Sequence, residues 1–182
     1  MTRFRLSLIF TAVCSLLIGS VPMTVPSASA LTVADNQSGA NNQSGANNQS
    51  DATTQALAKA RRATAKYQDI AQAEADGYVN INVYEPGEGL HYVNFALVDG
   101  TFDPEHPEVL LYANVHHANC LELVAVEYVV PLNLSSTAPE GFAGGADVWR
   151  QNSEGLGLWE LNAWIWLPNS NGVFAFKNPR VK

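Results

Sequence analysis

The 182-residue sequence contains only two cysteines, Cys14 and Cys120, and Cys14 lies in a segment that we expect to be removed. One remaining cysteine cannot form an intramolecular disulfide, even in an oxidising compartment. A free cysteine beside a strand usually behaves as a small buried hydrophobe. We therefore interpret Cys120 as a packing residue, and a reactive thiol is the alternative.

Positive charge is also scarce. The chain has 10 Lys+Arg against 17 Asp+Glu, and no Lys or Arg occurs between Lys66 and Arg150. Such acidity argues against nucleic acid and anionic membrane surfaces as partners, because both carry phosphate charge. A buried carboxylate between these two residues therefore has no basic neighbour in the sequence.

Several enzyme signatures are missing. The sequence has no Gly-x-Ser-x-Gly, no phosphate-binding loop, no dinucleotide fingerprint and no His-Glu-x-x-His. The adjacent His116 and His117 make a poor metal pair, because neighbouring strand residues point to opposite faces. The segment Asp99-Gly100-Thr101-Phe102-Asp103 does not match a calcium loop. We leave an enzyme open and lean towards a non-catalytic protein.

The first thirty residues have the pattern of a secretory signal peptide. Arg3 and Arg5 precede an apolar run from Leu6 to Ile18, and Ala28-Ser29-Ala30 matches a cleavage site. The run is too short for a membrane span, and no later segment approaches that length. We expect cleavage near Ala30, a secreted or periplasmic product, and no transmembrane segment after cleavage. Loss of both arginines changes the formal charge from −7 to −9.

Residues 31–50 contain a low-complexity repeat, NQSGAN-NQSGAN-NQS, that begins at Asn36. The repeat has no large apolar residue, so it cannot bury enough surface to fold by itself. We predict a disordered linker over residues 31–50 and one globular domain over residues 51–182. A domain of this length can bury a core without metals or disulfides. The sequence does not indicate its oligomeric state.

The domain begins with one helix pattern and continues with strand patterns. Residues 51–76 are alanine-rich, with Asp51 as the expected N-cap and Gly77 as the stop. Strand patterns follow at residues 78–84, 90–98, 108–115, 121–130 and 156–167, with a short apolar segment at 173–176. This order predicts an α+β domain, in which one N-terminal helix packs on a mainly antiparallel sheet or partial barrel of four to five strands.

The strand pattern from Leu121 to Val130 is the strongest in the chain, and one of its apolar faces carries Glu127. A strand that is apolar on both faces is usually covered on both sides, so we expect Glu127 to be buried or to line a cavity. A buried carboxylate needs a partner, a proton or a cation. His91 is the best candidate partner, because it shares an apolar strand face with Val93 and Phe95.

The chain resembles a family of uncharacterised secreted bacterial proteins with no assigned activity. The resemblance spans most of residues 78–179 and rests on the segments Gly89–Asn94, Asp103–Glu108, Leu123–Tyr128, Trp159–Trp166 and Asn169–Phe174. It implies that relatives carry His where Asn162 stands, and a Cys near the C-terminus that this chain lacks. Relatives would then present two His and one Glu, the makings of a metal site, and this chain has lost one ligand.

Three interpretations remain open. In the first, a non-catalytic domain binds a small molecule or cation in a pocket that contains His91, Glu127 and Asn162, roofed by residues 131–155. In the second, a metal-dependent or acid/base enzyme uses Glu127 as base and His91 as acid or metal ligand, with a divalent metal as candidate cofactor. In the third, the chain is a structural or envelope-associated protein in which His91 and Glu127 only form a hydrogen bond with each other.

Overall fold

The structure is a computed structural model that describes residues 43–116, 120–143, 146–152 and 155–182. The predicted signal peptide, residues 31–42 of the predicted linker, and His117 lie outside the described residues. Across the residues that are described, no helix combines the length and the apolar character needed to cross a membrane.

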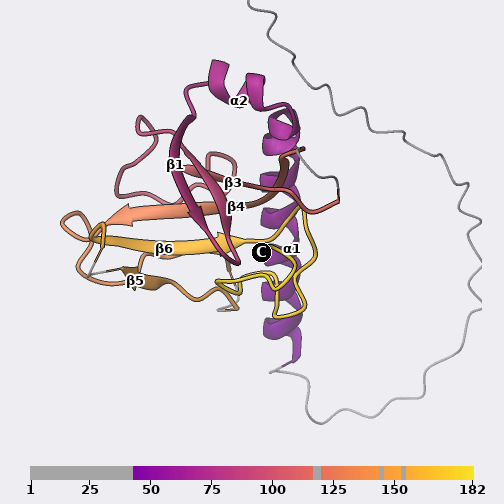
Figure 1. Cartoon of the computed structure of the whole chain (residues 1–182). Helices are drawn as coiled ribbons and strands as arrows, with labels where there is room; N and C mark the ends of the chain where they lie inside the picture. The colour runs from indigo at the N-terminus through magenta and orange to yellow at the C-terminus, as the bar shows by residue number, and fades with distance from the viewer. Residues whose placement is uncertain (1–42, 117–119, 144–145, 153–154) are drawn as a thin grey trace, which may run out of the picture. The chain divides into compact units, whose positions relative to one another are not determined.

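The described part of the chain combines two α-helices with one six-stranded sheet (Figure 1). Helix α1 (Gln43–Thr64) leads through a 3-10 turn (Ala65–Gln68) into helix α2 (Ile70–Ala75). The strands are β1 (Val79–Glu85), β2 (Gly89–Val93), β3 (Val109–Ala113), β4 (Glu122–Pro131), β5 (Arg150–Asn152) and β6 (Leu158–Ala163). All neighbouring strands are antiparallel, in the order β1-β2-β3-β4-β6-β5. The predicted α+β class with an antiparallel sheet is confirmed.

The predicted strand number and the partial barrel are wrong. The sheet has six strands and is open, because β1 and β5 form its two edges. The sequence does not reveal β5, since Arg150-Gln151-Asn152 is short, polar and set in a region rich in loop residues. Its strand conformation depends on pairing with β6, which tertiary structure supplies.

The single helix predicted over residues 51–76 is divided at Asp69. This residue has an extended backbone, and its side chain accepts a hydrogen bond of 3.0 Å from the backbone N–H of Ala71. The cap starts α2 as a separate helix. At the other end, α1 begins at Gln43, ahead of the predicted N-cap Asp51 and within the repeat.

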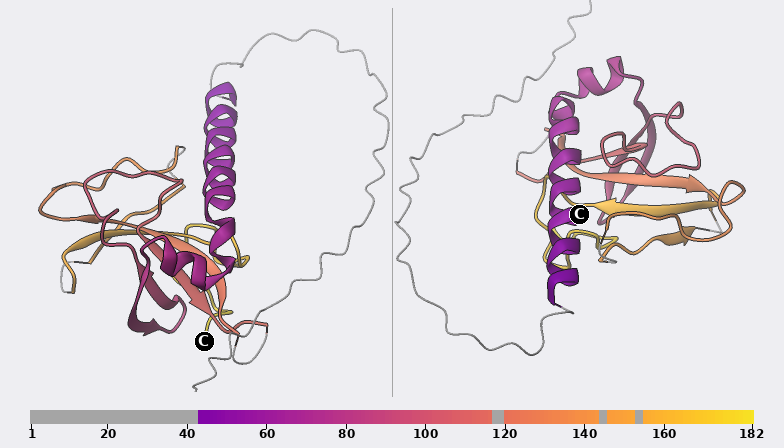
Figure 2. Two further views of the ribbon diagram at one scale, coloured as in Figure 1. Left: turned by 90° about the horizontal axis from the view of Figure 1, so that it is seen from above. Right: turned by 180° about the vertical axis from the view of Figure 1, so that it is seen from behind.

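Helix α1 stands across the direction of β4 and β6, next to the end of β6 (Figures 1 and 2). Side-chain contacts to the segment after β6 hold it there. The Trp166 Nε1 donates a hydrogen bond of 3.1 Å to the hydroxyl of Thr64, and the Arg61 guanidinium donates to the carbonyl of Ile165. The helix is therefore fixed to the sheet through residues that directly follow its last strand.

One face of the sheet packs with the helices. Its central side chain is Tyr112, which is fully buried and whose hydroxyl donates a 2.6 Å hydrogen bond to the carbonyl of Tyr67. Tyr67 lies in the same apolar cluster, and Ile70 packs against that cluster. The helical segment therefore packs on the sheet through Tyr67 and Ile70.

The C-terminal segment, residues 164–182, covers the other face of the sheet. Trp164, Leu167 and Val181 pack in one apolar cluster with Leu111 and Val129 of the central strands. Backbone hydrogen bonds between Asn178 or Val181 and Gly87 anchor the segment to the β1–β2 turn. Strand β4 is thus covered on both faces, as predicted. The apolar segment at 173–176 is not a strand, and its Val173 and Phe174 pack with the cluster on the helix side instead.

A β-bulge changes the predicted faces of β4. Leu111 pairs with Ala125, but the next residue of β3, Tyr112, pairs with Leu123, so Val124 is an extra residue. Leu123 therefore packs on the helix side with Tyr112, whereas strict alternation along residues 121–130 would place it on the face of Glu127. Beyond the bulge the predicted alternation holds, and it brings Glu127 to the face under the C-terminal segment.

Candidate functional site

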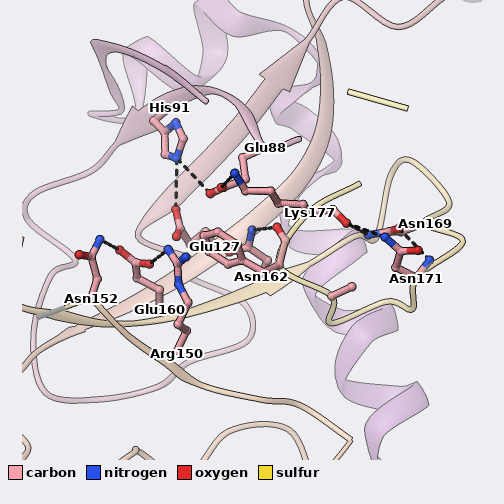
Figure 3. Close-up of polar contacts among 12 residues, drawn as sticks. Glu88, His91, Glu127, Arg150, Asn152, Glu160, Asn162, Asn169, Asn171 and Lys177 are labelled. Atoms are coloured by element: carbon pink, nitrogen blue, oxygen red, sulfur yellow. Dashed lines mark hydrogen bonds and ion pairs between the residues drawn. The ribbon is translucent and has the colours of Figure 1, made fainter. Parts of the chain in front are cut away.

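His91 and Glu127 meet under the C-terminal segment (Figure 3). They lie on β2 and β4 with β3 between them, and the His91 Nε2 is 3.8 Å from the Glu127 Oε2. Both side chains are buried, with 9% of His91 and 3% of Glu127 exposed. The alternation of side chains along each strand places both residues on the same face of the sheet.

Glu88 is a third member of this group, and the sequence did not single it out. It lies in the β1–β2 turn, only 2% of it is exposed, and its Oε2 is 3.9 Å from the His91 Nε2. Its Oε1 is 3.9 Å from the Lys177 Nζ, which comes from the C-terminal segment. A glutamate between two turn glycines is usually exposed, so the sequence pattern held no signal for its burial. We call Glu88, His91 and Glu127 the carboxyl–imidazole cluster.

The orientation of the His91 ring follows from its contacts. Its Nδ1 lies 3.2 Å from the carbonyl oxygen of Val83, which can only accept a hydrogen bond. Nδ1 therefore carries a proton, and Nε2 faces the two carboxyl groups. The distances from Nε2 to those carboxyls are too long for direct hydrogen bonds. The cluster is a loose contact rather than a closed hydrogen-bonded triad.

Burial controls the charge of the two carboxyl groups. Burial, followed by repulsion from Glu85, raises the pKa of Glu88 to about 8. Burial also raises the pKa of Glu127 well above its ordinary value, with further increases from the charges of Glu160 and Glu88. Burial therefore favours the protonated form of both carboxyl groups, since desolvation disfavours the ionised form.

No group of three or more His, Cys, Asp and Glu among the described residues is arranged to hold a metal ion. Metal binding at the carboxyl–imidazole cluster would also have to displace the protons of its carboxyl groups. The metal site at His91 and Glu127 stays a prediction, which a titration described below tests.

A pocket of about 610 Å³ lies at the β5–β6 edge of the sheet. Asn162 of β6, the pairing partner of Glu127 on β4, contributes to it. Its walls come from the segment before β5 and from the C-terminal segment: Ala146, Val148, Trp149, Arg150, Glu160, Asn162 and residues 171–176. The predicted roof, residues 131–155, contributes only its later part. His91 and Glu127 are not among the described residues that line the pocket.

Asn162 presents an unpaired acceptor in this pocket. Only 2% of the residue is exposed, and its Nδ2 donates a 3.0 Å hydrogen bond to the carbonyl of Phe176. Its Oδ1 is buried and has no hydrogen-bond partner. A buried acceptor without a partner costs about 1–3 kcal/mol. A bound ligand with an N–H or O–H group would recover that free energy.

The charged side chains of the pocket are bonded to protein groups. The Glu160 carboxylate accepts from Arg150 Nη2 at 2.6 Å and from Asn152 Nδ2 at 2.7 Å, as Figure 3 shows. The Arg150 guanidinium also lies 3.2 Å from the centre of the Phe176 ring. Arg150 therefore pairs with Glu160.

Replacing Arg150 is expected to destabilise the domain. Arg150→Ala leaves the buried Glu160 carboxylate with Asn152 alone and removes a cation from the Phe176 ring. We expect the free energy of unfolding to fall by about 1–2 kcal/mol, a discounted value because nearly half of the Arg150 side chain is exposed. Urea unfolding measures it. In the Glu160→Gln background the loss should be smaller, and an equal loss in both backgrounds would contradict the pairing.

These features define an α+β domain with one open antiparallel sheet and a pocket whose lining includes Asn162, a residue with an unpaired amide oxygen. Comparison of the chain with protein families, curated proteins and solved structures finds no match. The resemblance to uncharacterised secreted bacterial proteins therefore stays a prediction, and the function is argued from the site alone.

Proposed function

We propose that this protein is a secreted, non-catalytic binding protein that holds a small polar ligand in the pocket beside Asn162. The unpaired, buried Oδ1 of Asn162 carries the proposal. Buried polar atoms are nearly always hydrogen-bonded, so an orphaned acceptor in a pocket indicates that a partner arrives from outside. Mostly apolar walls with a few polar groups are typical of sites for small molecules.

The arrangement favours binding over catalysis. A general base has to reach the reacting atoms, whereas His91 and Glu127 do not belong to the pocket lining among the described residues. Glu160, the carboxylate that does line it, already accepts hydrogen bonds from Arg150 and Asn152. The pocket thus offers recognition groups without an available acid or base.

A fragment screen by ligand-observed NMR tests this function on the purified full-length chain. Val148 lines the pocket and is 72% exposed, so Val148→Trp fills the pocket without disturbing the core. We expect a set of small polar fragments to bind the unmodified chain and to lose binding in Val148→Trp.

Leu134→Trp is the matched control, because Leu134 is 58% exposed and does not line the pocket. This variant should bind the same fragments as the unmodified chain. If Val148→Trp binds every fragment as well as Leu134→Trp does, the pocket is not the binding site and the proposal fails.

A second candidate function is metal-dependent or acid/base chemistry at the carboxyl–imidazole cluster. The observation in its favour is the approach of the His91 Nε2 to two carboxyl groups, at 3.8 and 3.9 Å. Its metal-dependent form requires that the chain binds about one equivalent of a divalent metal and that Glu127→Gln loses this metal with an unchanged melting temperature.

Calorimetric titration with Zn²⁺ and Mn²⁺ decides the metal-dependent form of this second candidate. Absence of stoichiometric binding by the unmodified chain excludes the metal-dependent function. A lower melting temperature of Glu127→Gln as the only effect assigns His91 and Glu127 to the core, which is the structural interpretation.

A further inference from the structure

We infer that the pocket selects a neutral ligand, with an amide or hydroxyl group on a flat apolar body, over charged ligands of the same size. This inference rests on the proposed function and specifies the class of ligand. It follows from three properties of the pocket: its charges are already paired, its unpaired atoms are neutral, and most of its lining is apolar.

The paired charges disfavour a charged ligand. Both oxygens of Glu160 accept hydrogen bonds, one from Arg150 and one from Asn152. A ligand cation would have to compete for Glu160, and a ligand anion would have to draw Arg150 away from it. Drawing Arg150 away would leave the buried Glu160 carboxylate without its cation, which is costly, and a ligand cation would have to displace a hydrogen-bonded guanidinium.

The unpaired atoms define the complement of the pocket. Three buried side-chain N or O atoms of the described residues lack a hydrogen-bond partner, and two of them, the Asn162 Oδ1 and the Trp149 Nε1, belong to residues that line the pocket. One is an acceptor, the other is a donor, and neither is charged. The Trp149 Nε1 lies beside Gly141, which is not among the described residues that line the pocket. The Asn162 Oδ1 therefore sets the requirement for the ligand, and the N–H of an amide or the O–H of a hydroxyl meets it.

The orientation of the Asn162 amide is determined by its neighbour. The carbonyl oxygen of Phe176 can only accept, so the Nδ2 must face it at 3.0 Å and the Oδ1 must point away. A flipped amide would set two oxygens against each other. The unpaired atom is therefore an acceptor, and it requires a donor from the ligand.

The remaining lining suits an apolar body. Val148, Trp149, Val173 and Phe174 contribute hydrophobic side chains to a volume of about 610 Å³, which lies in the range of small-molecule sites. A flat ring buries most of its surface against such walls. The simplest ligand of the inferred class is therefore a primary amide on an aromatic ring.

Three probes of nearly equal size test the class: benzamide, benzylammonium and benzoate, titrated at pH 7 into the full-length chain and followed by NMR. Benzamide is expected to bind about tenfold tighter than either charged probe, because one additional hydrogen bond contributes about that factor in affinity. Asn162→Leu should remove this preference. Asn169→Ala should retain it, because Asn169 makes the same kind of bond, to the Lys177 carbonyl at 3.1 Å, outside the pocket.

Each outcome decides the inference. Tighter binding of benzylammonium or benzoate that Val148→Trp blocks would overturn the ligand class and leave the proposed function standing. The ligand class is also overturned, and the proposed function still stands, if none of the three probes binds while Val148→Trp blocks fragment binding in the screen. Benzamide binding that Val148→Trp leaves unchanged overturns the inference, and Val148→Trp also provides the decisive variant if Asn162→Leu fails to fold.

Discussion

Raising the pH from about 5 to about 8 is expected to lower the free energy of unfolding by about 3 kcal/mol or more. Glu88 and Glu108 are each 2% exposed, and burial raises the pKa of both from 4.5 to about 8. Within this window the unfolded chain has ionised carboxylates, whereas the folded chain still holds their protons. The contribution of these two groups to the free energy of unfolding is therefore fully present below pH 4.5, and it is lost as the pH rises through their pKa in the folded state.

Other carboxyl groups do not offset this loss. The pKa of Asp76 is lowered from 3.8 mainly by its hydrogen bond to Lys66. Burial raises the pKa of Asp103, but hydrogen bonds to His106 and to the Glu105 N–H outweigh it and leave this pKa lowered as well. The stabilising contribution of both groups is therefore already complete below the window. The pKa of Glu127 is raised well above its ordinary value, mainly by burial, so this residue acts in the same direction as Glu88 and Glu108. The combined contribution of these carboxyl groups to the free energy of unfolding therefore falls as the pH rises.

Urea unfolding at pH 5, 6, 7 and 8 measures the effect. Glu108→Gln should flatten the pH dependence, because the glutamine can still accept the 3.1 Å hydrogen bond from the Val129 N–H without titrating. Glu140→Gln is the control, since Glu140 is exposed and its replacement should leave the slope unchanged. Constant or rising stability between pH 5 and 8 would show that these carboxyl groups are ionised in the fold.

Tyr112→Ala is expected to cost about 3–5 kcal/mol of stability. Tyr112 is fully buried, stacks edge-on against Tyr92 at a centroid distance of 4.9 Å, and donates a hydrogen bond to the Tyr67 carbonyl. Its removal leaves a cavity between the sheet and the helices and an unpaired carbonyl at the 3-10 turn. Docking of α2 on the sheet should weaken as a result.

Two comparison variants separate the contributions in thermal and urea unfolding. Tyr112→Phe keeps the ring and loses only the hydroxyl, so it should cost about 1 kcal/mol. Tyr84→Ala removes a tyrosine that is 47% exposed and should also cost about 1 kcal/mol or less. If Tyr112→Ala costs no more than Tyr84→Ala, the helices do not depend on this contact.

The sequence predicted the part of the site that depends on strand periodicity. Alternation along β2 and β4 was enough to bring His91 and Glu127 to one face, because no bulge intervenes between Glu127 and its pairing partners. The same reasoning failed for Leu123, where the extra residue Val124 reverses the alternation. Alternation along a strand predicts which face of the sheet a side chain occupies only where the strand register is regular.

The missed features depend on tertiary contacts. Glu88 is buried because the C-terminal segment, anchored to Gly87, closes over a turn that would otherwise be exposed. The division of the helix at Asp69 and the short strand β5 both have weak signals in the local sequence. The division depends on the capping hydrogen bond of Asp69, and β5 depends on its pairing with β6. The pocket itself is built from residues 146–150 and 171–176, whose meeting no local pattern predicts.

The most direct test of the account is a crystal structure of the full-length chain soaked with benzamide. The account predicts benzamide in the pocket, with its amide N–H within hydrogen-bond distance of the Asn162 Oδ1 and its ring against Val173 and Phe174. A pocket that stays free of benzamide at saturating concentration, with the Asn162 Oδ1 bonded to another protein group, would contradict it.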